Sequence, residues 1–112
     1  MNAFEMVQAA AKEVGVNAYP HTYNGKDKKW ITYQTITERP DLFGDDSPEA
    51  VVSRVQINLF IPESFNYLDL KNSLRKALEN QGFTVPEVVN STIETDTKIR
   101  HITMECETDE NY

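Results

Sequence analysis

The sequence predicts an α+β fold in which a mainly antiparallel sheet of four to five strands is packed by two helices. Apolar residues occupy every second position from Arg54 to Ile61, which is typical of a strand with one packed and one solvated face. Pro62 ends this strand because it has no N–H to donate. Between Tyr67 and Gln81 the apolar period then becomes helical. We expect the apolar faces of this strand and this helix to pack together.

The central helix carries signals at both ends. Asn66 is a candidate N-cap with Asp69 in the first turn, and Gly82 stands where a left-handed residue ends a helix. The apolar stripe comprises Tyr67, Leu70, Leu74, Ala77, Leu78 and Gln81. Leu74 and Leu78 lie at its centre, so they are predicted to be core residues.

A shorter helix is predicted at the N-terminus. Asn2, followed three residues later by Glu5, resembles a capping box, and Gly15 is a natural stop. The apolar positions of this helix share about a third of the helical wheel; they are Ala3, Phe4, Val7, Ala10, Ala11 and Val14. Its alanines favour close approach to a neighbouring element.

Further strands are predicted around these elements. Asn24-Gly25 indicates a hairpin between the extended segment from Val16 to Tyr23 and a strand from Trp30 to Thr37. Another strand runs from Phe83 to about Val89, where Pro86 requires an edge or a bulge.

Thr95-Asp96 predicts a turn before the last strand, which runs from Lys98 to Glu107. Alternation on this strand places Ile102, Met104 and Cys106 on one face, and His101, Thr103 and Glu105 on the other.

Two segments are predicted to lie outside the packed sheet of a single domain spanning residues 1–112. Glu38 to Glu49 is a mobile loop of 12 residues, longer than most connections. Residues 107–112 form an acidic, frayed tail.

Composition excludes several classes of function. One cysteine rules out an internal disulfide and fits a reducing compartment. No apolar run approaches the roughly 20 residues of a membrane helix, and no secretory signal is visible. The net charge of −7 argues against a surface that follows nucleic-acid phosphates. The charge is unevenly distributed along the chain. From Glu87 onward there are seven acidic and two basic residues, whereas Lys26, Lys28 and Lys29 form a small basic cluster around Asp27.

The residues with catalytic or metal-binding chemistry do not form a site. His101 and Cys106 are an odd number of positions apart, so a strand places them on opposite faces and prevents a Cys–His pair. No Cys or His spacing fits structural zinc, and His21 stands alone. No glycine-rich loop fits a phosphate. We therefore expect no enzyme, no catalytic residue, no cofactor and no metal.

The acids Asp41, Asp45 and Asp46 raise the alternative of a calcium loop. Their spacing lacks the alternating ligands and the closing glutamate of an EF-hand, so a solvated acidic loop is the better interpretation. Within that loop, Leu42 and Phe43 are adjacent and apolar. They either fold back as a latch on the core or anchor a partner.

The order of elements resembles the tail-terminator and tail-completion proteins of long-tailed bacteriophages and prophages. The residues that carry the resemblance are Gly15-Val16, Tyr19-Pro20, Trp30 to Tyr33, Arg54 to Phe60, Gly82-Phe83 and the strand from Lys98 to Glu105 with His101-Ile102-Thr103. This likeness covers most of the chain, and it is a pattern of elements without a catalytic signature.

The resemblance implies a structural virion protein that forms a ring, with a hexamer as the candidate size, to end the tail tube and join tail to head. Its partners would be other copies, tail-tube proteins and head-connector proteins, with no membrane, and DNA would pass through without specific binding. It would occur in the host bacterial cytoplasm during assembly and in the tail or neck of the virion. The family's long loop often serves ring formation, which favours Leu42, Phe43, Asp45 and Asp46 as interface residues.

Two alternatives come from other classes. The first is a small acidic cytosolic regulator or inhibitor that binds a basic partner as a monomer. The second is a small enzyme whose site assembles only between subunits, from His21, His101 or carboxylates. A ring subunit instead needs two different patches that meet head to tail, and an acidic lining would repel DNA phosphates.

Overall fold

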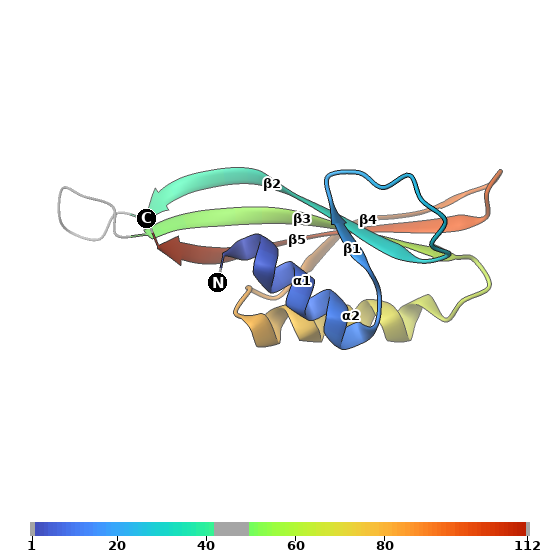
Figure 1. Cartoon of the computed structure of the whole chain (residues 1–112), viewed down its shortest axis with the longest axis horizontal. Coiled ribbons are helices and arrows are strands. Elements are labelled where there is room, and N and C mark those ends of the chain that lie inside the picture. The colour runs from blue at the N-terminus through green and yellow to red at the C-terminus, as the bar shows by residue number, and fades with distance from the viewer. Residues whose placement is uncertain (1, 42–49, 112) are drawn as a thin grey trace.

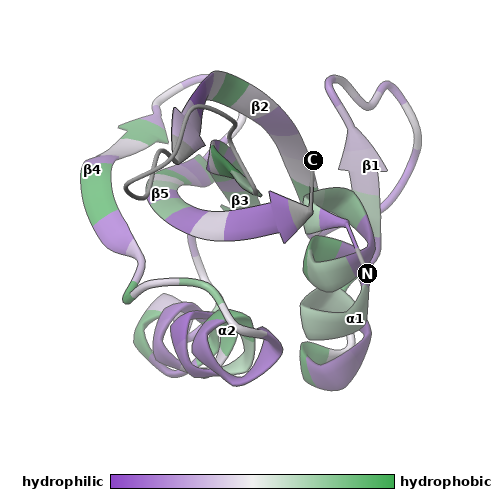
Figure 2. Ribbon diagram, turned by 90° about the vertical axis from the view of Figure 1, so that its left-hand side faces the viewer, coloured by the Kyte–Doolittle hydropathy of each residue, from purple (hydrophilic) through white to green (hydrophobic). Residues whose placement is uncertain are grey.

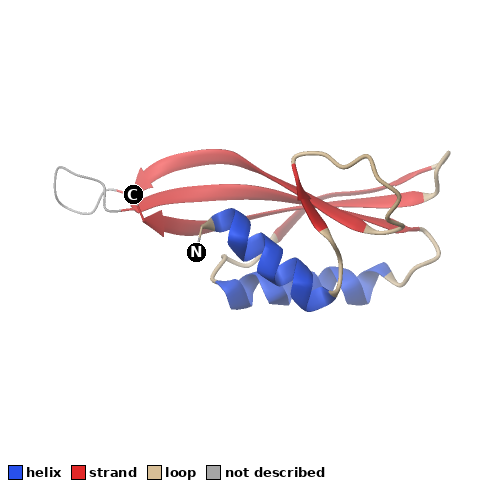
Figure 3. Ribbon diagram, in the orientation of Figure 1, coloured by secondary structure: helices blue, strands red, loops and turns tan. Residues whose placement is uncertain are grey.

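The computed structural model describes residues 2–41 and 50–111, which form an α+β fold (Figures 1 and 3). The elements in chain order are α1 (Ala3–Val14), β1 (Ala18–Pro20), β2 (Trp30–Asp41), β3 (Ala50–Pro62), α2 (Tyr67–Gln81), β4 (Glu87–Glu94) and β5 (Ile99–Asn111). None of the helices described is long and apolar enough to cross a membrane.

The five strands form one sheet in the order β1-β2-β3-β5-β4. The pairs β2–β3, β3–β5 and β4–β5 are antiparallel, whereas β1 and β2 are parallel. Both helices lie on one face of the sheet, and no helix of the residues that the structure describes lies on the opposite face (Figures 1 and 2). We call that opposite face the open face.

The core lies between the sheet and the helices, as the apolar patterns predict. Leu74 and Leu78 of α2 are fully buried, and so are Ile57 and Leu59 of β3. Helix α1 and strands β2 and β5 also contribute large core residues: Met6, Val7, Ile31, Tyr33, Ile102 and Met104. The two-residue alternation on β3 therefore separates its core face from its open face.

Both predicted helices begin and end as expected. Asn2 and Glu5 form a reciprocal capping box at α1, and the Asn66 side chain accepts a hydrogen bond from the Asp69 N–H at α2. Gly15 and Gly82 end the helices in the left-handed region, with φ of 75° and 113°. An L side chain is strained in that region, which explains glycine at both positions.

The predicted hairpin at Asn24-Gly25 is wrong, because β1 runs parallel to β2. Ile31 N–H donates to Asn17 O at 2.9 Å, and His21 N–H donates to Tyr33 O at 2.8 Å. The chain leaves β1 through His21, which has a positive φ of 66°. Contacts within the connection therefore override the turn propensity of Asn-Gly.

The prediction that Glu38 to Glu49 is a loop is wrong for residues 38–41, which belong to β2 and pair with residues 50–53 of β3. Pro40 is tolerated because β1 pairs only with residues 31–33, so this part of β2 is an edge that needs no second donor. The predicted interface residues Leu42, Phe43, Asp45 and Asp46, and the predicted mobility of this segment, lie outside the described residues.

The prediction of a frayed tail is wrong for residues 107–111, which extend β5 along the first half of β3. The carboxylate of Glu110 accepts a hydrogen bond from Ala3 N–H at 2.9 Å and another from the Ser53 hydroxyl. The tail is therefore held by a strand partner and by the start of α1.

The strand predicted from Phe83 to Val89 is displaced, since β4 begins at Glu87. Phe83 is buried in the core, and Pro86 precedes the strand. A bulge interrupts the pairing between Val88 and Asn90. The predicted turn at Thr95-Asp96 is confirmed.

Candidate interaction surface

Aromatic rings form a continuous row across the open face. The register pairs Trp30 with Phe60 and Phe60 with His101, and these rings stack with centroid distances of 4.9 Å and 4.3 Å. Tyr23 continues the row at 5.7 Å from Trp30, and Tyr19 stacks on Tyr23 at 4.0 Å. We call these five residues the aromatic row. The row joins β1, the loop after it, β2, β3 and β5. The apolar patterns of the sequence did not predict that these side chains pack together.

Polar side chains lie beside the aromatic row. Asn58 Oδ1 accepts a hydrogen bond from the Thr103 hydroxyl at 3.0 Å and lies 2.9 Å from His101 Nε2. The pKa of His101 is lowered, first because burial disfavours the charged ring, with Glu94 acting weakly in the opposite direction. A neutral imidazole at pH 7 fits an Nε2–H that donates to Asn58.

A cluster of charged side chains occupies the open face towards the other end of the long strands. Arg54 contacts Glu105 at 2.8 Å, Glu107 at 3.3 Å and Glu87 at 3.5 Å. Arg39 makes two hydrogen bonds to Glu107, at 3.0 Å and 3.1 Å. We call these five residues the charge cluster; it bridges β2, β3 and β5 to the start of β4.

Hydrogen bonds within the cluster shift the pKa values of Glu107 and Arg54. Donation by Arg39 is the main reason that the pKa of Glu107 is lowered, with a smaller contribution from Arg54. The pKa of Arg54 is raised, chiefly by its hydrogen bond to Glu105. The raised pKa of Arg54 and the lowered pKa of Glu107 both favour the charged forms, so the ion pair between these two side chains is maintained at neutral pH.

The two histidines and the cysteine do not come together as a catalytic pair. His101 lies on the open face, whereas Cys106 is buried on the helix side, as the sequence predicts. Burial raises the pKa of Cys106 to about 12, so the nucleophilic thiolate is scarce at neutral pH. His21 is exposed and contacts Phe4 edge-on at 6.3 Å. Within residues 2–41 and 50–111, no group of three His, Cys, Asp or Glu side chains is arranged to hold a metal.

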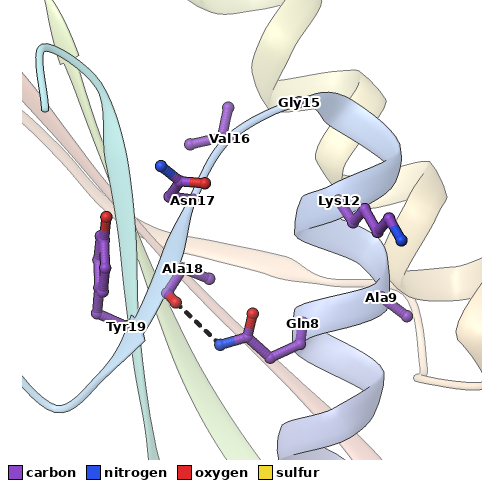
Figure 4. A pocket seen from close by; sticks show the side chains of 8 residues that line it. All are labelled: Gln8, Ala9, Lys12, Gly15, Val16, Asn17, Ala18 and Tyr19. Atoms are coloured by element: carbon purple, nitrogen blue, oxygen red, sulfur yellow. Dashed lines mark hydrogen bonds between the residues drawn. The ribbon is translucent and has the colours of Figure 1, made fainter.

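An open depression of about 720 Å³ lies between α1 and β1 (Figure 4). Its lining residues are Gln8, Ala9, Lys12, Gly15, Val16, Asn17, Ala18 and Tyr19. Gln8 Nε2 donates to Ala18 O at 2.9 Å and so occupies a carbonyl of β1. Lys12 is the one charged residue among these lining residues. The lining is therefore positively charged and contains no pair of groups for acid–base catalysis.

The two edges of the sheet are unlike. On one side, β1 has only three residues, ends in Pro20 and is partly occupied by Gln8, while the rest of that side is the edge of β2 that contains Pro40. β4 has eight residues and pairs only with β5, so its outer N–H and C=O groups are available. Large apolar side chains are exposed on it, at Val89 (46%) and Ile93 (38%), and just before it, at Val85 (63%). The β4 edge is therefore the better place for strand addition by another chain.

The sequence patterns missed both the aromatic row and the exposed side of β4. One signal for the row was available, because Phe60 is an aromatic residue on the otherwise polar phase of its strand. Its partners Trp30 and His101 could be assigned only after the strand register was known. Exposure of Val89 follows from the bulge beside it, which sequence alternation does not reveal.

Neither a scan of protein-family models nor a search of curated proteins found a match to this chain.

Proposed function

We propose that this chain is a structural virion protein of a long-tailed phage or prophage. Copies form a ring that ends the tail tube and joins tail to head. One rim of the ring binds tail-tube protein and the other binds head-connector protein, while DNA crosses without specific binding. The role needs no catalytic group, cofactor or metal.

The observation that carries the proposal is the difference between the two edges of the sheet. A subunit with two unlike sides favours a heterologous contact, in which one side of a copy binds the other side of the next. Such contacts close into a ring when the rotation between copies is suitable. The open β4 edge supplies backbone groups for this contact, and the β1 side supplies a depression beside α1.

Part of the acidic charge is not available to the alternative of an inhibitor that mimics nucleic acid. Such a mimic needs unpaired acids that a basic partner can reach. In the charge cluster, however, Glu105 and Glu107 are bound by Arg54 from within the chain. The overall charge of −7 is compatible with a ring through which DNA moves, because it repels phosphate.

Capping of purified tail tubes tests the proposal. Tubes grown from tail-tube protein should stop lengthening when the chain is added, and electron microscopy should show a ring at one tube end. A Leu42→Ser/Phe43→Ser variant should fold but fail to cap, as expected if those residues anchor a partner. The control is Leu68→Ser, which alters an exposed leucine in the first turn of α2.

Two results would count against this function. Tubes that keep growing in the presence of folded protein would contradict tail termination. Tight binding of the monomer to a basic protein, without capping, would favour the inhibitor alternative.

A further inference from the structure

We infer that the contact between copies joins the acidic β4 side of one copy to the basic β1 side of the next. This inference rests on the proposed ring and identifies its subunit interface. The β4 side comprises residues 85–97. The β1 side comprises the connection 21–29, which we call the lysine loop, together with the depression between α1 and β1.

The β4 side combines free backbone, apolar side chains and negative charge. Val85 and Val89 are exposed beside an edge that pairs only with β5. From residue 87 to residue 97 the chain has three acids and no base. Glu87 is shared with Arg54, whereas Glu94 and Asp96 are exposed at the far end of the strand. An apolar centre with charged ends is typical of a protein interface.

The lysine loop is an ordered positive surface. Its one acid, Asp27, accepts hydrogen bonds from Tyr19 Oη at 2.6 Å and from Asn17 Nδ2 at 3.2 Å, which turns its carboxylate inward. Tyr23 stacks on Tyr19 and also accepts a hydrogen bond from the Asp27 N–H at 3.1 Å. Lys26 and Lys28 remain exposed. The aromatic row therefore holds the loop in place while its lysines face outward.

The positions of these two surfaces favour a head-to-tail contact between copies over a two-fold contact. β1 and β4 are the opposite edges of the sheet, and Figure 2 shows them on opposite sides of the molecule. A two-fold contact through either edge would bring like charges together, which costs free energy. A head-to-tail contact pairs acids with lysines and brings Val85 and Val89 to the depression that contains Lys12. Charge complementarity thus favours a second copy as the occupant of each surface.

A charge-swap experiment tests this interface. The basic-side variant is Lys26→Glu/Lys28→Glu, and the acidic-side variant is Glu94→Lys/Asp96→Lys. Each variant alone brings like charges together at every contact, so its association constant should fall about tenfold or more at low salt. An equimolar mixture should recover association, because the reversed loop of one variant then meets the reversed edge of the other. Sedimentation velocity measures both results.

Matched controls separate this interface from a general effect of charge. Lys71→Glu and Glu38→Lys/Asp109→Lys change the net charge in the same two directions away from both surfaces, and they should assemble as the wild type does. A second readout uses engineered thiols: Val89→Cys and Lys12→Cys chains should become cross-linked by a bismaleimide when mixed. Cys106 is buried and should not interfere.

The outcomes distinguish the interface from the function. If wild-type rings form and cap tubes, but the mixture does not recover association and the thiols do not cross-link, the interface lies elsewhere and the proposed function stands. If wild-type protein neither associates nor caps tubes, the proposed function fails and this interface fails with it.

Discussion

The imidazole of His101 stacks on the ring of Phe60 across the β3–β5 pair, with 4.3 Å between centroids and 20° between the planes. The other face of the Phe60 ring is stacked by Trp30 at 4.9 Å and 12°. Cross-strand pairs of this kind stabilise a sheet, and aromatic contacts add to the effect of burial. The open face is therefore stabilised by contacts among its own side chains, since both described helices, α1 and α2, lie on the other face of the sheet.

The first prediction concerns the pH dependence of stability that burial of His101 produces. Its folded-state pKa is lowered from 6.5, so between that lowered value and 6.5 the unfolded chain binds more protons than the folded chain. The free energy of unfolding should therefore fall as pH falls below 6.5. His101→Gln should lose less stability than the wild type between about pH 7.5 and about pH 5.5 in urea titrations.

The matched control for this measurement is His21→Gln, because His21 is exposed on the connection after β1. It measures how much a His→Gln change at an exposed position alters the pH dependence, for comparison with His101→Gln. Equal pH dependence in His101→Gln and the wild type would show that the stacked ring protonates as freely as in the unfolded chain.

The second prediction concerns the packing of α2 on the sheet. Leu78 is fully buried, so Leu78→Ala should lower the free energy of unfolding by about 2–5 kcal/mol. Leu68, on the same helix, is 50% exposed, and Leu68→Ala should cost no more than about 0.5 kcal/mol. Denaturant titration compares the two; equal losses would mean that the helix does not bury its apolar stripe as described.

The third prediction is that Cys106 resists thiol reagents in the folded protein. The side chain is 1% exposed, and its pKa is raised to about 12, so neither access nor ionisation favours attack. Labelling at pH 8 should be slower than in denaturant by at least about 100-fold, since it requires opening of the core. Labelling at the denatured rate would place the thiol at the surface and would support the enzyme alternative.

The fourth prediction concerns Arg54, the centre of the charge cluster. Arg54→Leu leaves the carboxylates of Glu87, Glu105 and Glu107 close together with less compensation. After solvent screening we expect a loss of about 1 kcal/mol at low salt, falling as salt is added. Arg75→Leu on α2 is the control. A loss that does not change with salt would indicate packing of the arginine stem as the main contribution.

Local patterns in the sequence determined the elements whose causes lie within a few residues. The helices Ala3–Val14 and Tyr67–Gln81 were predictable because their caps and apolar periods are local signals. For the same reason, the sequence predicted which face of β3 is buried and that Ile102, Met104 and Cys106 form the buried face of β5. The α+β class follows from those elements together.

Only the tertiary structure decided the features that depend on residues far apart in the chain. The acidic end of β5 is a strand because residues 50–54 of β3 offer it a partner, and no property of residues 107–111 alone indicates this. β1 is parallel to β2 because Tyr19, Tyr23 and Asp27 fix the connection after it against the propensity of Asn24-Gly25. The stack of Trp30, Phe60 and His101 likewise exists only because the register aligns three strands, and register is set by the packed sheet as a whole.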